Sequence, residues 1–532
     1  KDTTVTVRHS LGSKKPKVSA LTVDGNRYPI RYKVMDANTI RIETRDSIRI
    51  KLTAIQGPKP EDNRWYKIAQ SAARVAMMVR NVSVTYKNTY AMSISGFRPE
   101  IGDMLGQTKG ASGFAPGLDF AFGMTGDSYI NKALDNGWLV SDSVVSPATT
   151  NAQEDLQIRM TLEPVRDLKI DLNAGRTRNK SNQIQFMYEG MPQIQSGNFN
   201  MTVITIGSAF ERRSASNGYS SSSFNRFLGN LDIIKNRIEN MYAGVPYQGQ
   251  SGLNQQPLYQ VNKYSSDVMI PAFLAAYTGR SASNSALDLF PGILSMMPNW
   301  RVTYSGLSKL EFFKKYFKSV TLNHAYRSTY SVGSYSTFQN FHSYMGDWGF
   351  VDDIQTGIPV PSSMYDVSAV SINEQFSPLL GVDVTFKNGI TTKVEYKTTR
   401  ILNLSLAANQ IVESSTKDFV LGMGYKIMGL ELFPGRNKKD SKNKISNDLA
   451  LRMDVSFRNQ SALARDIQQV TTQATSGNKA LKISFSADYT LSRLLSVSFY
   501  YDRQKNTPLV SASSYPVTSA DFGMRLKFSL TR

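Results

Sequence analysis

The residues that decide the fold are Val82-Ser-Val-Thr-Tyr-Lys-Asn-Thr-Tyr-Ala-Met-Ser-Ile-Ser95, where apolar and polar side chains alternate. A period of two is typical of a strand whose two faces meet different surroundings. One face holds Val82, Val84, Tyr86, Tyr90, Met92 and Ile94. The length of the stretch matches a tilted strand that crosses a bilayer, which needs about 9–11 residues.

The same alternation returns along the rest of the chain. Apolar residues alternate with polar ones in residues 156–163, 168–173, 449–458, 481–489 and 522–530. We count roughly 16 or 17 such segments, most of them close to the length of a membrane-crossing strand. A soluble sandwich also alternates, but its strands usually span about 5–6 residues and its apolar face is mainly aliphatic. Here Tyr and Phe recur near segment ends, as in interfacial aromatic girdles, so we predict an all-β, large antiparallel transmembrane β-barrel.

The opposite face of these segments carries the charged residues. Facing lipid they would be costly, so we predict that they line a water-filled lumen. The predicted lumen-lining residues are Lys87, Arg159, Lys169, Asp171, Lys393, Glu395, Arg452, Asp454, Lys482, Asp488, Arg525 and Lys527.

Composition excludes several other classes. The 532 residues carry a net charge of +20, but Lys and Arg are dispersed with acids among them, so we expect no nucleic-acid partner. The chain has no Cys and only three His, which excludes disulfide scaffolds, thiolate metal sites and cysteine nucleophiles. No apolar run approaches the roughly 18 residues of a spanning helix. Because phosphate-binding loops, zinc motifs and nucleophile elbows are also missing, we expect neither an enzyme nor a cofactor or metal.

The pattern predicts five regions along the chain. They are a small antiparallel β module over residues 1–60, a linking helix over 61–80, barrel strands over 81–213, an extracellular helical insertion over 214–298, and barrel strands from 299 to 532. The chain begins without Met or a targeting segment, so we expect a processed protein or a fragment of a longer one.

The predicted insertion has a helical stripe. In Phe224 to Tyr242 the apolar residues recur at helical spacing, and Phe227, Leu231, Ile234 and Ile238 are the predicted cap-helix residues. We expect this helix to act as a cap or gate on the cell surface.

Connection lengths predict the orientation of the barrel. We expect tight turns at Phe376–Leu379 and Thr399–Leu402, and longer polar links at Glu413–Asp418 and Asn459–Asn478. Outer-membrane barrels have short periplasmic turns and longer external loops. The strand count therefore predicts a bacterial outer-membrane protein whose C-terminus is periplasmic.

Several blocks resemble one family. Gly113-Phe-Ala-Pro-Gly-Leu-Asp-Phe-Ala-Phe-Gly123, Pro298-Asn-Trp-Arg-Val-Thr-Tyr-Ser-Gly-Leu-Ser-Lys309 and Phe376-Ser-Pro-Leu-Leu-Gly-Val-Asp383 are similar to the carboxy-terminal part of the SprA/Sov proteins. So are Asn81-Val-Ser-Val-Thr-Tyr86 and His324-Ala-Tyr-Arg-Ser-Thr-Tyr-Ser-Val-Gly333. These proteins are the outer-membrane translocons of the type IX secretion system, associated in some bacteria with gliding motility.

The resemblance implies a protein-conducting channel. It implies a single-chain barrel of about 36 strands with a lateral opening, through which folded cargo proteins leave the periplasm. The implied partners are the upstream part of the same polypeptide, secreted cargo proteins, a PorV-like accessory outer-membrane protein at the lateral opening, a plug protein and the lipid bilayer. This chain would supply about half of the strands.

Two other functions fit the alternation. The chain could be most of a smaller barrel that acts as a small-molecule transporter or receptor, because about 16–18 strands leave a small-solute channel. It could also be a secreted soluble adhesin built from β modules. Conductance separates the first from a protein-conducting channel, and solubility without detergent identifies the second.

Overall fold

The computed structural model places most of the chain. It describes residues 3–44, 48–56, 77–100, 102–110, 113–140, 146–187, 193–211, 214–245, 260–353, 357–430, 447–491, 495–510 and 515–529. The chain divides into two compact units, Lys1–Val79 and Arg80–Arg532. Most of the predicted linking helix lies outside the described residues, and β7 begins at Val79.

The first unit is a small β module. Its strands are β1 (Thr3–Arg8), β2 (Pro16–Thr22), β3 (Arg27–Tyr28), β4 (Arg31–Val34), β5 (Thr39–Thr44) and β6 (Ile50–Gln56). They form two three-stranded antiparallel sheets, in the orders β1-β5-β4 and β3-β2-β6. Buried residues of the described module include Pro16, Ala20, Ile40 and Ile42, because alternate residues of β2 and β5 face inward.

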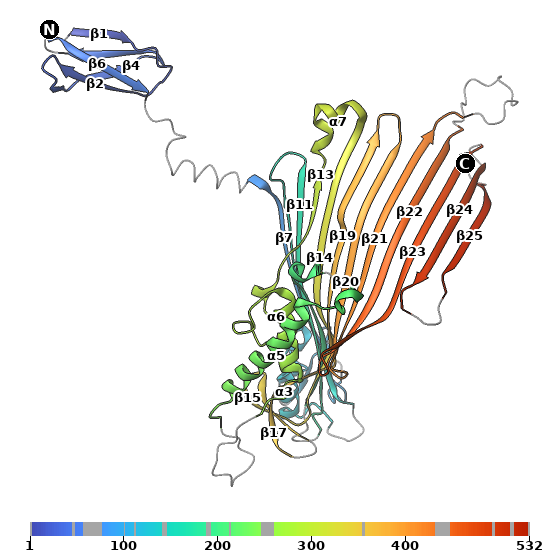
Figure 1. The fold of residues 1–532 in the computed structure, drawn as a ribbon. Coiled ribbons are helices and arrows are strands. Elements are labelled where there is room, and N and C mark those ends of the chain that lie inside the picture. Colours follow the sequence, from blue (N-terminus) through green and yellow to red (C-terminus); the bar gives the residue numbers. More distant parts are fainter. Residues whose placement is uncertain are drawn as a thin grey trace. The chain divides into compact units, whose positions relative to one another are not determined.

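The second unit is built on one large antiparallel sheet (Figure 1). It has 14 strands, and its main path runs β25-β24-β23-β22-β21-β20-β19-β14-β12-β11-β10-β7, with β13 and β18 paired beside that path. The strands are β7 (Val79–Ser93), β10 (Ala148–Leu162), β11 (Leu168–Ile184), β12 (Ile194–Thr202), β13 (Asn299–Tyr304), β14 (Phe317–Thr337), β18 (Tyr365–Val367), β19 (Ala369–Phe386), β20 (Thr391–Ser405), β21 (Gln410–Ile427), β22 (Leu449–Asp466), β23 (Thr471–Thr490), β24 (Leu495–Pro508) and β25 (Val517–Phe528).

Smaller elements occupy the connections. They are β8 (Thr108–Gly110), β9 (Gly113–Ala115), α2 (Leu118–Ala121), α3 (Tyr129–Asp135), α4 (Ile206–Ala209), α5 (Ser222–Met241), α6 (Ser266–Thr278), α7 (Glu311–Tyr316), β15 (Phe341–Met345), β16 (Trp348–Asp352) and β17 (Pro359–Ser363). Strands β15, β16 and β17 form a separate sheet, so this part of the chain adds no strand to the large one. None of the described helices is both long and apolar enough to cross a bilayer.

The strand count of the large sheet differs from the sequence prediction, and the predicted closure of the barrel is not shown. The large sheet has 14 strands instead of the 16 or 17 expected, partly because segments predicted to be separate belong to single long strands. Within the described residues the sheet is open, because β7 and β25 stand at the two ends of the strand order. The described residues therefore form a large antiparallel sheet, which is consistent with part of a barrel wall but does not show a closed barrel of 36 strands.

Two predicted turns lie inside strands. Phe376–Leu379 falls within β19 and Thr399–Leu402 falls within β20, while the chain reverses in residues 387–390 and 406–409. The pairing of β19 with β20 shifts between Phe376 and Leu380, because Pro378 has no N–H to donate to the ladder. The sequence prediction mistook this bulge for the end of a strand.

The predicted long links at Glu413–Asp418 and Asn459–Asn478 are also mostly strand. The first lies inside β21, and only four residues, 467–470, separate β22 from β23. These strands reach 18 to 20 residues, or about 60 Å at roughly 3.3 Å per residue, whereas a bilayer core is about 30 Å thick. Each strand is therefore long enough to extend well beyond a membrane.

The largest described insertions lie at one end of the strands. Helices α4, α5 and α6, hereafter the helical unit, connect β12 to β13 and lie at the end opposite the C-terminus (Figure 1). The sheet of β15–β17 and the elements between β7 and β10 leave from the same end as the helical unit. The C-terminal end has short reversals at residues 163–167 and 387–390, together with α7, and residues 428–448, most of which lie outside the described residues, join β21 to β22 there.

Candidate functional site: the two faces of the sheet

One face of the large sheet is apolar across neighbouring strands. Antiparallel register places Val394, Leu421, Val455 and Ile483 in one row that runs over β20 to β23. A parallel row joins Met423, Met453, Phe485, Tyr501 and Phe522 over β21 to β25. Directly opposite residues share a face, so these rows form one continuous surface, hereafter the apolar face.

This apolar face is exposed. Phe485 and Met453 are each 42% exposed, Phe457 is 45% exposed and Met524 is 57% exposed. Monomeric soluble proteins rarely expose contiguous apolar patches of more than a few hundred Å². A surface that extends over several adjacent strands therefore indicates contact with lipid or with another apolar surface.

The other side of the same strands is polar and charged. Register places Lys393, Gly422, Asp454, Ser484 and Asp502 in one row from β20 to β24. This row alternates with the apolar row because successive side chains of a strand point to opposite faces. We name this side the charged face.

All 12 predicted lumen-lining residues lie in strands of the large sheet, at positions that alternate with its apolar residues. Lys87 is in β7, Arg159 in β10, Lys169 and Asp171 in β11, Lys393 and Glu395 in β20, Arg452 and Asp454 in β22, Lys482 and Asp488 in β23, and Arg525 and Lys527 in β25. The structure thus groups them on the charged face.

Ion pairs on the charged face involve these residues. Glu395 pairs with Lys393 and with Lys397 at 2.9 Å each, and Lys169 pairs with Asp171 at 3.1 Å. The carboxyl of Glu395 is the more buried partner, and its two lysines remain more exposed. Partly exposed ion pairs of this kind stabilise a fold by only about 0–1 kcal/mol. Because they are weak and partly solvated, their charges can still interact with a molecule that contacts the charged face.

A cavity on the charged face brings three predicted residues together. A space of about 330 Å³ is lined by Lys393, Arg452 and Asp454, together with Asp383 of β19. Gly422 lies between Lys393 and Asp454 in the register, and a Cβ there would be only 2.8 Å from an Asp454 carboxylate oxygen. Glycine at this position therefore leaves the space that the charged side chains occupy.

A larger cavity contains residues that the sequence analysis missed. A space of about 850 Å³ is lined by Arg159 and Asp171, which were predicted, and by Arg301 and Arg327, which were not. Arg301 is opposite Asp171 in the pairing of β11 with β13. The sequence does carry a signal for Arg301, since Trp300, Val302 and Tyr304 alternate with Arg301 and Thr303. The alternating segment is only six residues long, which is short for a membrane-crossing strand.

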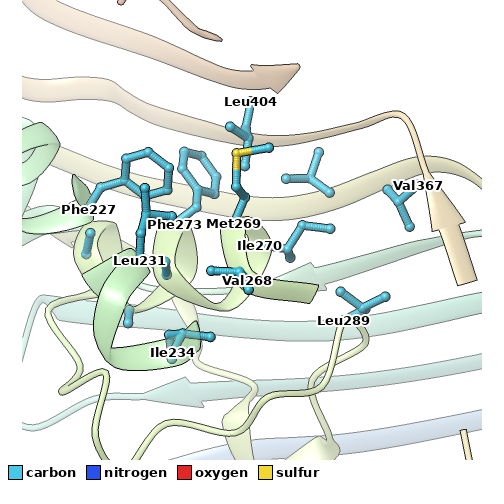
Figure 2. Close-up of a cluster of buried hydrophobic side chains, with 14 of the residues drawn as sticks. Phe227, Leu231, Ile234, Val268, Met269, Ile270, Phe273, Leu289, Val367 and Leu404 are labelled. Atoms are coloured by element: carbon cyan, nitrogen blue, oxygen red, sulfur yellow. The ribbon is translucent and has the colours of Figure 1, made fainter. Parts of the chain in front are cut away.

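The helical unit packs on the apolar face. The four predicted cap-helix residues, Phe227, Leu231, Ile234 and Ile238, are each 0% exposed and belong to one buried cluster. This cluster includes Leu404 and Val367 of the sheet, which Figure 2 labels, and it also includes Ile372, Leu402 and Ile411. Leu402 and Leu404 share a face with Val394, so the helices cover the same side that is exposed further along the strands.

This placement shows which face of the sheet the predicted cap helix covers. The described contacts anchor α5 and α6 to the apolar face beyond its exposed part, and the helices do not lie on the charged face. The sequence pattern identified a buried helical stripe but could not identify the surface that buries it.

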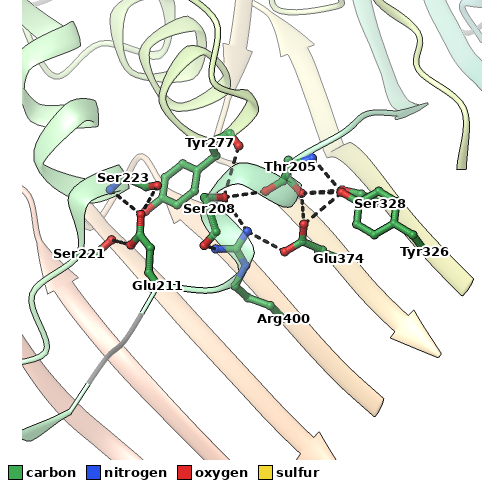
Figure 3. A network of polar contacts seen from close by, with 10 residues as sticks. All are labelled: Thr205, Ser208, Glu211, Ser221, Ser223, Tyr277, Tyr326, Ser328, Glu374 and Arg400. Atoms are coloured by element: carbon green, nitrogen blue, oxygen red, sulfur yellow. Dashed lines mark hydrogen bonds and ion pairs between the residues drawn. The ribbon is translucent and has the colours of Figure 1, made fainter. Parts of the chain in front are cut away.

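A polar layer lies where the exposed apolar face meets the helical unit (Figure 3). Arg400 of β20 and Glu374 of β19 form an ion pair at 2.7 Å, and each side chain is only 2% exposed. Arg400 also donates to the carbonyl and hydroxyl oxygens of Ser208 in α4, at 2.6 and 2.7 Å. Glu374 accepts from the hydroxyls of Thr205 and Tyr326, at 2.6 and 3.1 Å.

A second buried ion pair joins the adjacent strands. Arg465 of β22 and Glu413 of β21 form a pair at 3.2 Å, with side-chain exposures of 0% and 1%. Arg465 also donates to the carbonyl of Tyr219 at 2.9 Å, and its guanidinium lies 5.4 Å from the ring centre of Phe224. The strands thus hold the helical unit by two buried arginines.

Glu211 supports the start of α5. Its carboxylate accepts the hydroxyls of Ser221, Ser222 and Ser223 at 2.5 to 2.7 Å and the backbone N–H of Ser223 at 2.9 Å. Burial opposes ionisation, but these hydrogen bonds outweigh it and hold the pKa of Glu211 at about 2. A carboxylate at a helix N-terminus also interacts favourably with the helix dipole.

We expect Glu211→Gln to destabilise α5 in a pH-dependent way. The folded-state pKa is below the unfolded one, so the stabilisation is fully present above about pH 4.5 and is lost as pH falls towards 2. At neutral pH the loss should be about 1–2 kcal/mol, because Glu211 is only half buried. Hydrogen exchange of the α5 amides, recorded as a function of pH, measures this loss of helix stability. Asp232→Asn, at an exposed ion pair on the same helix, is the control, and a loss independent of pH would contradict this account.

Among the described residues, no three His, Asp or Glu side chains lie close enough together to hold a metal ion.

No protein-family model and no curated protein matches the chain. Among solved structures, OmpT, an outer-membrane protein of Vibrio cholerae, aligns with 84% of this chain and 99% of its own, at 7% identity and a TM-score of 0.19. An anion-selective porin from Comamonas acidovorans aligns over the same shares, at 8% identity and a TM-score of 0.10. TM-scores this low carry no argument about fold or function.

Proposed function

We propose that the large sheet is part of the wall of a β-barrel in a bacterial outer membrane. The observation that carries this proposal is the register of the two faces, in which exposed apolar rows and charged rows run in parallel across adjacent strands. In hydrocarbon every backbone polar group needs a partner, and a sheet that closes on itself satisfies this requirement. The apolar face contacts lipid, and the charged face lines water.

The open edges support a wall that continues into other strands. Within the described residues, β7 and β25 are each paired along one side only. An unpaired edge in lipid costs several kcal/mol for each backbone group, so both edges need partners. We propose that an upstream part of the same polypeptide supplies them, as the resemblance to the SprA/Sov translocons implies.

The proposed transport function is passage of folded cargo proteins in type IX secretion. A wall of about 36 strands, as the resemblance implies, is wider than the 16–18 strands of a small-solute channel, and these 14 strands would be a part of it. The charged face, with both signs of charge interspersed, suits a hydrated protein client. The accessory protein at the lateral opening and the plug protein remain proposed partners.

The insertions support an orientation. In outer-membrane barrels the longer connections lie outside the cell and the shorter ones in the periplasm. The helical unit and the β15–β17 sheet, which are the largest described insertions, both leave from the end opposite the C-terminus. We therefore propose that the helical unit is extracellular and that the C-terminus is periplasmic.

Site-specific crosslinking of a stalled cargo tests the proposed function. A photoreactive residue replaces Asp454 or Lys482 on the charged face, and matched controls replace the adjacent Val455 or Ile483 on the apolar face. We expect cargo crosslinks from the first pair only and lipid crosslinks from the second. If neither pair reaches cargo while conductance shows a small-solute channel, the small-molecule transporter is the correct function.

A further inference from the structure

The connection from β13 to β14 places an aromatic cluster at the C-terminal end of the sheet. In α7 and the start of β14, the ring centres of Phe312, Phe313, Tyr316 and Phe317 follow one another at 5.6 to 6.5 Å. Phe317 lies 4.9 Å from Phe386, which is opposite it in the register. Because Phe386 alternates with Asp383 and shares a face with Val384, the cluster continues the apolar face.

This aromatic cluster is largely exposed. Phe312 is 72% exposed, Tyr316 is 51% exposed and the adjacent Leu310 is 53% exposed. Aromatic side chains at the edge of a membrane-spanning apolar surface are typical of the headgroup region, where an apolar ring and a polar tip are both satisfied.

Three lysines stand beside these rings. Lys314 and Lys315 are exposed residues of α7, and exposed Lys318 occupies a register shift at the start of β14. None of the ion pairs among the described residues involves these lysines, in contrast to Lys309, which pairs with Asp167 at 2.6 Å. The Lys315 amine lies 5.5 Å from the Tyr316 ring centre.

We infer that α7 and the start of β14 form a binding site for the phosphate headgroup of an anionic phospholipid in the periplasmic leaflet. The three lysine amines supply a positive charge that complements the phosphate, and the exposed rings contact the glycerol and upper acyl chains. The inference rests on the proposed function, because it needs the sheet to span the membrane with this end periplasmic. Each lysine near an anionic lipid surface contributes roughly a fivefold increase in affinity.

Lipid retention tests the inference. The whole polypeptide is inserted into vesicles of phosphatidylethanolamine with a minor share of phosphatidylglycerol, extracted gently, and its bound lipids are counted by native mass spectrometry. We expect the wild type to retain phosphatidylglycerol and Lys314→Gln/Lys315→Gln/Lys318→Gln to retain at least tenfold less, from the sum of three contributions. The matched control, Lys14→Gln/Lys15→Gln/Lys17→Gln in the N-terminal module, removes the same charge from exposed residues and should retain lipid like the wild type.

The possible failures are distinguishable. Equal retention by the wild type and the α7 variant, with normal insertion, would overturn the headgroup site and leave the membrane wall intact. In a second set of vesicles that also contain lipid A, lysine-dependent retention of lipid A in place of phosphatidylglycerol would also overturn it, because lipid A occupies the other leaflet. Failure of the wild type to insert into vesicles would overturn the proposed function itself.

Discussion

Arg400→Ala is expected to destabilise the attachment of the helical unit to the sheet by about 3–5 kcal/mol. The variant leaves the carboxylate of Glu374 buried without its cation and removes the hydrogen bond from Arg400 to the carbonyl of Ser208. The remaining hydrogen bonds from Thr205 and Tyr326 to Glu374 do not neutralise its charge. Limited proteolysis and hydrogen exchange of α5 and α6, with denaturant unfolding, measure the loss.

Two comparisons keep this prediction falsifiable. Arg458→Ala removes an arginine that pairs with Asp418 at 2.8 Å on the charged face, where its side chain is 59% exposed, so it should cost at most about 1 kcal/mol. The double variant Arg400→Met/Glu374→Met removes both charges and should recover most of the loss. A similar cost for Arg400→Ala and Arg458→Ala would show that the polar layer does not hold the helices.

Phe485→Arg is expected to reduce stability in a bilayer by about 2–4 kcal/mol. Phe485 is the middle of the five apolar-face positions of β23 that begin at Leu481 and end at Tyr489, so in the proposed membrane wall an arginine there would enter the centre of the hydrocarbon region. Urea unfolding in phospholipid vesicles, followed by tryptophan fluorescence, gives the difference from the wild type.

The neighbouring residue provides the control. Ser484 is one position away on the charged face, opposite Asp454 in β22 and Asp502 in β24. Ser484→Arg therefore introduces the same side chain between two acids in water, and we expect a change within about 1 kcal/mol of either sign. If Phe485→Arg and Ser484→Arg behaved alike, the two faces would meet the same environment and the membrane wall would be wrong.

The sequence predicts a strand correctly where all side chains on one face of that strand have the same surroundings. Leu421 to Ile427 of β21 alternates cleanly, because alternate side chains are exposed on the apolar face or belong to the charged face. Nearer the start of the same strand, Glu413 lies on the apolar face, where the second buried ion pair places it under the helical unit. A carboxylate at an apolar-face position interrupts the alternation, so the sequence pattern predicted a polar link at Glu413–Asp418 where the strand in fact continues.

The sequence by itself determined the antiparallel β class, the strand faces and the helical stripe of α5, because these depend on periods of two and 3.6 residues that lie within single segments. Only the tertiary structure decided the strand lengths, the open 14-stranded order and the surface that buries α5. These features depend on partners far away in the chain. Arg400 becomes compatible with an apolar face only because Ser208 and Glu374, 192 and 26 residues earlier in the chain, surround its guanidinium.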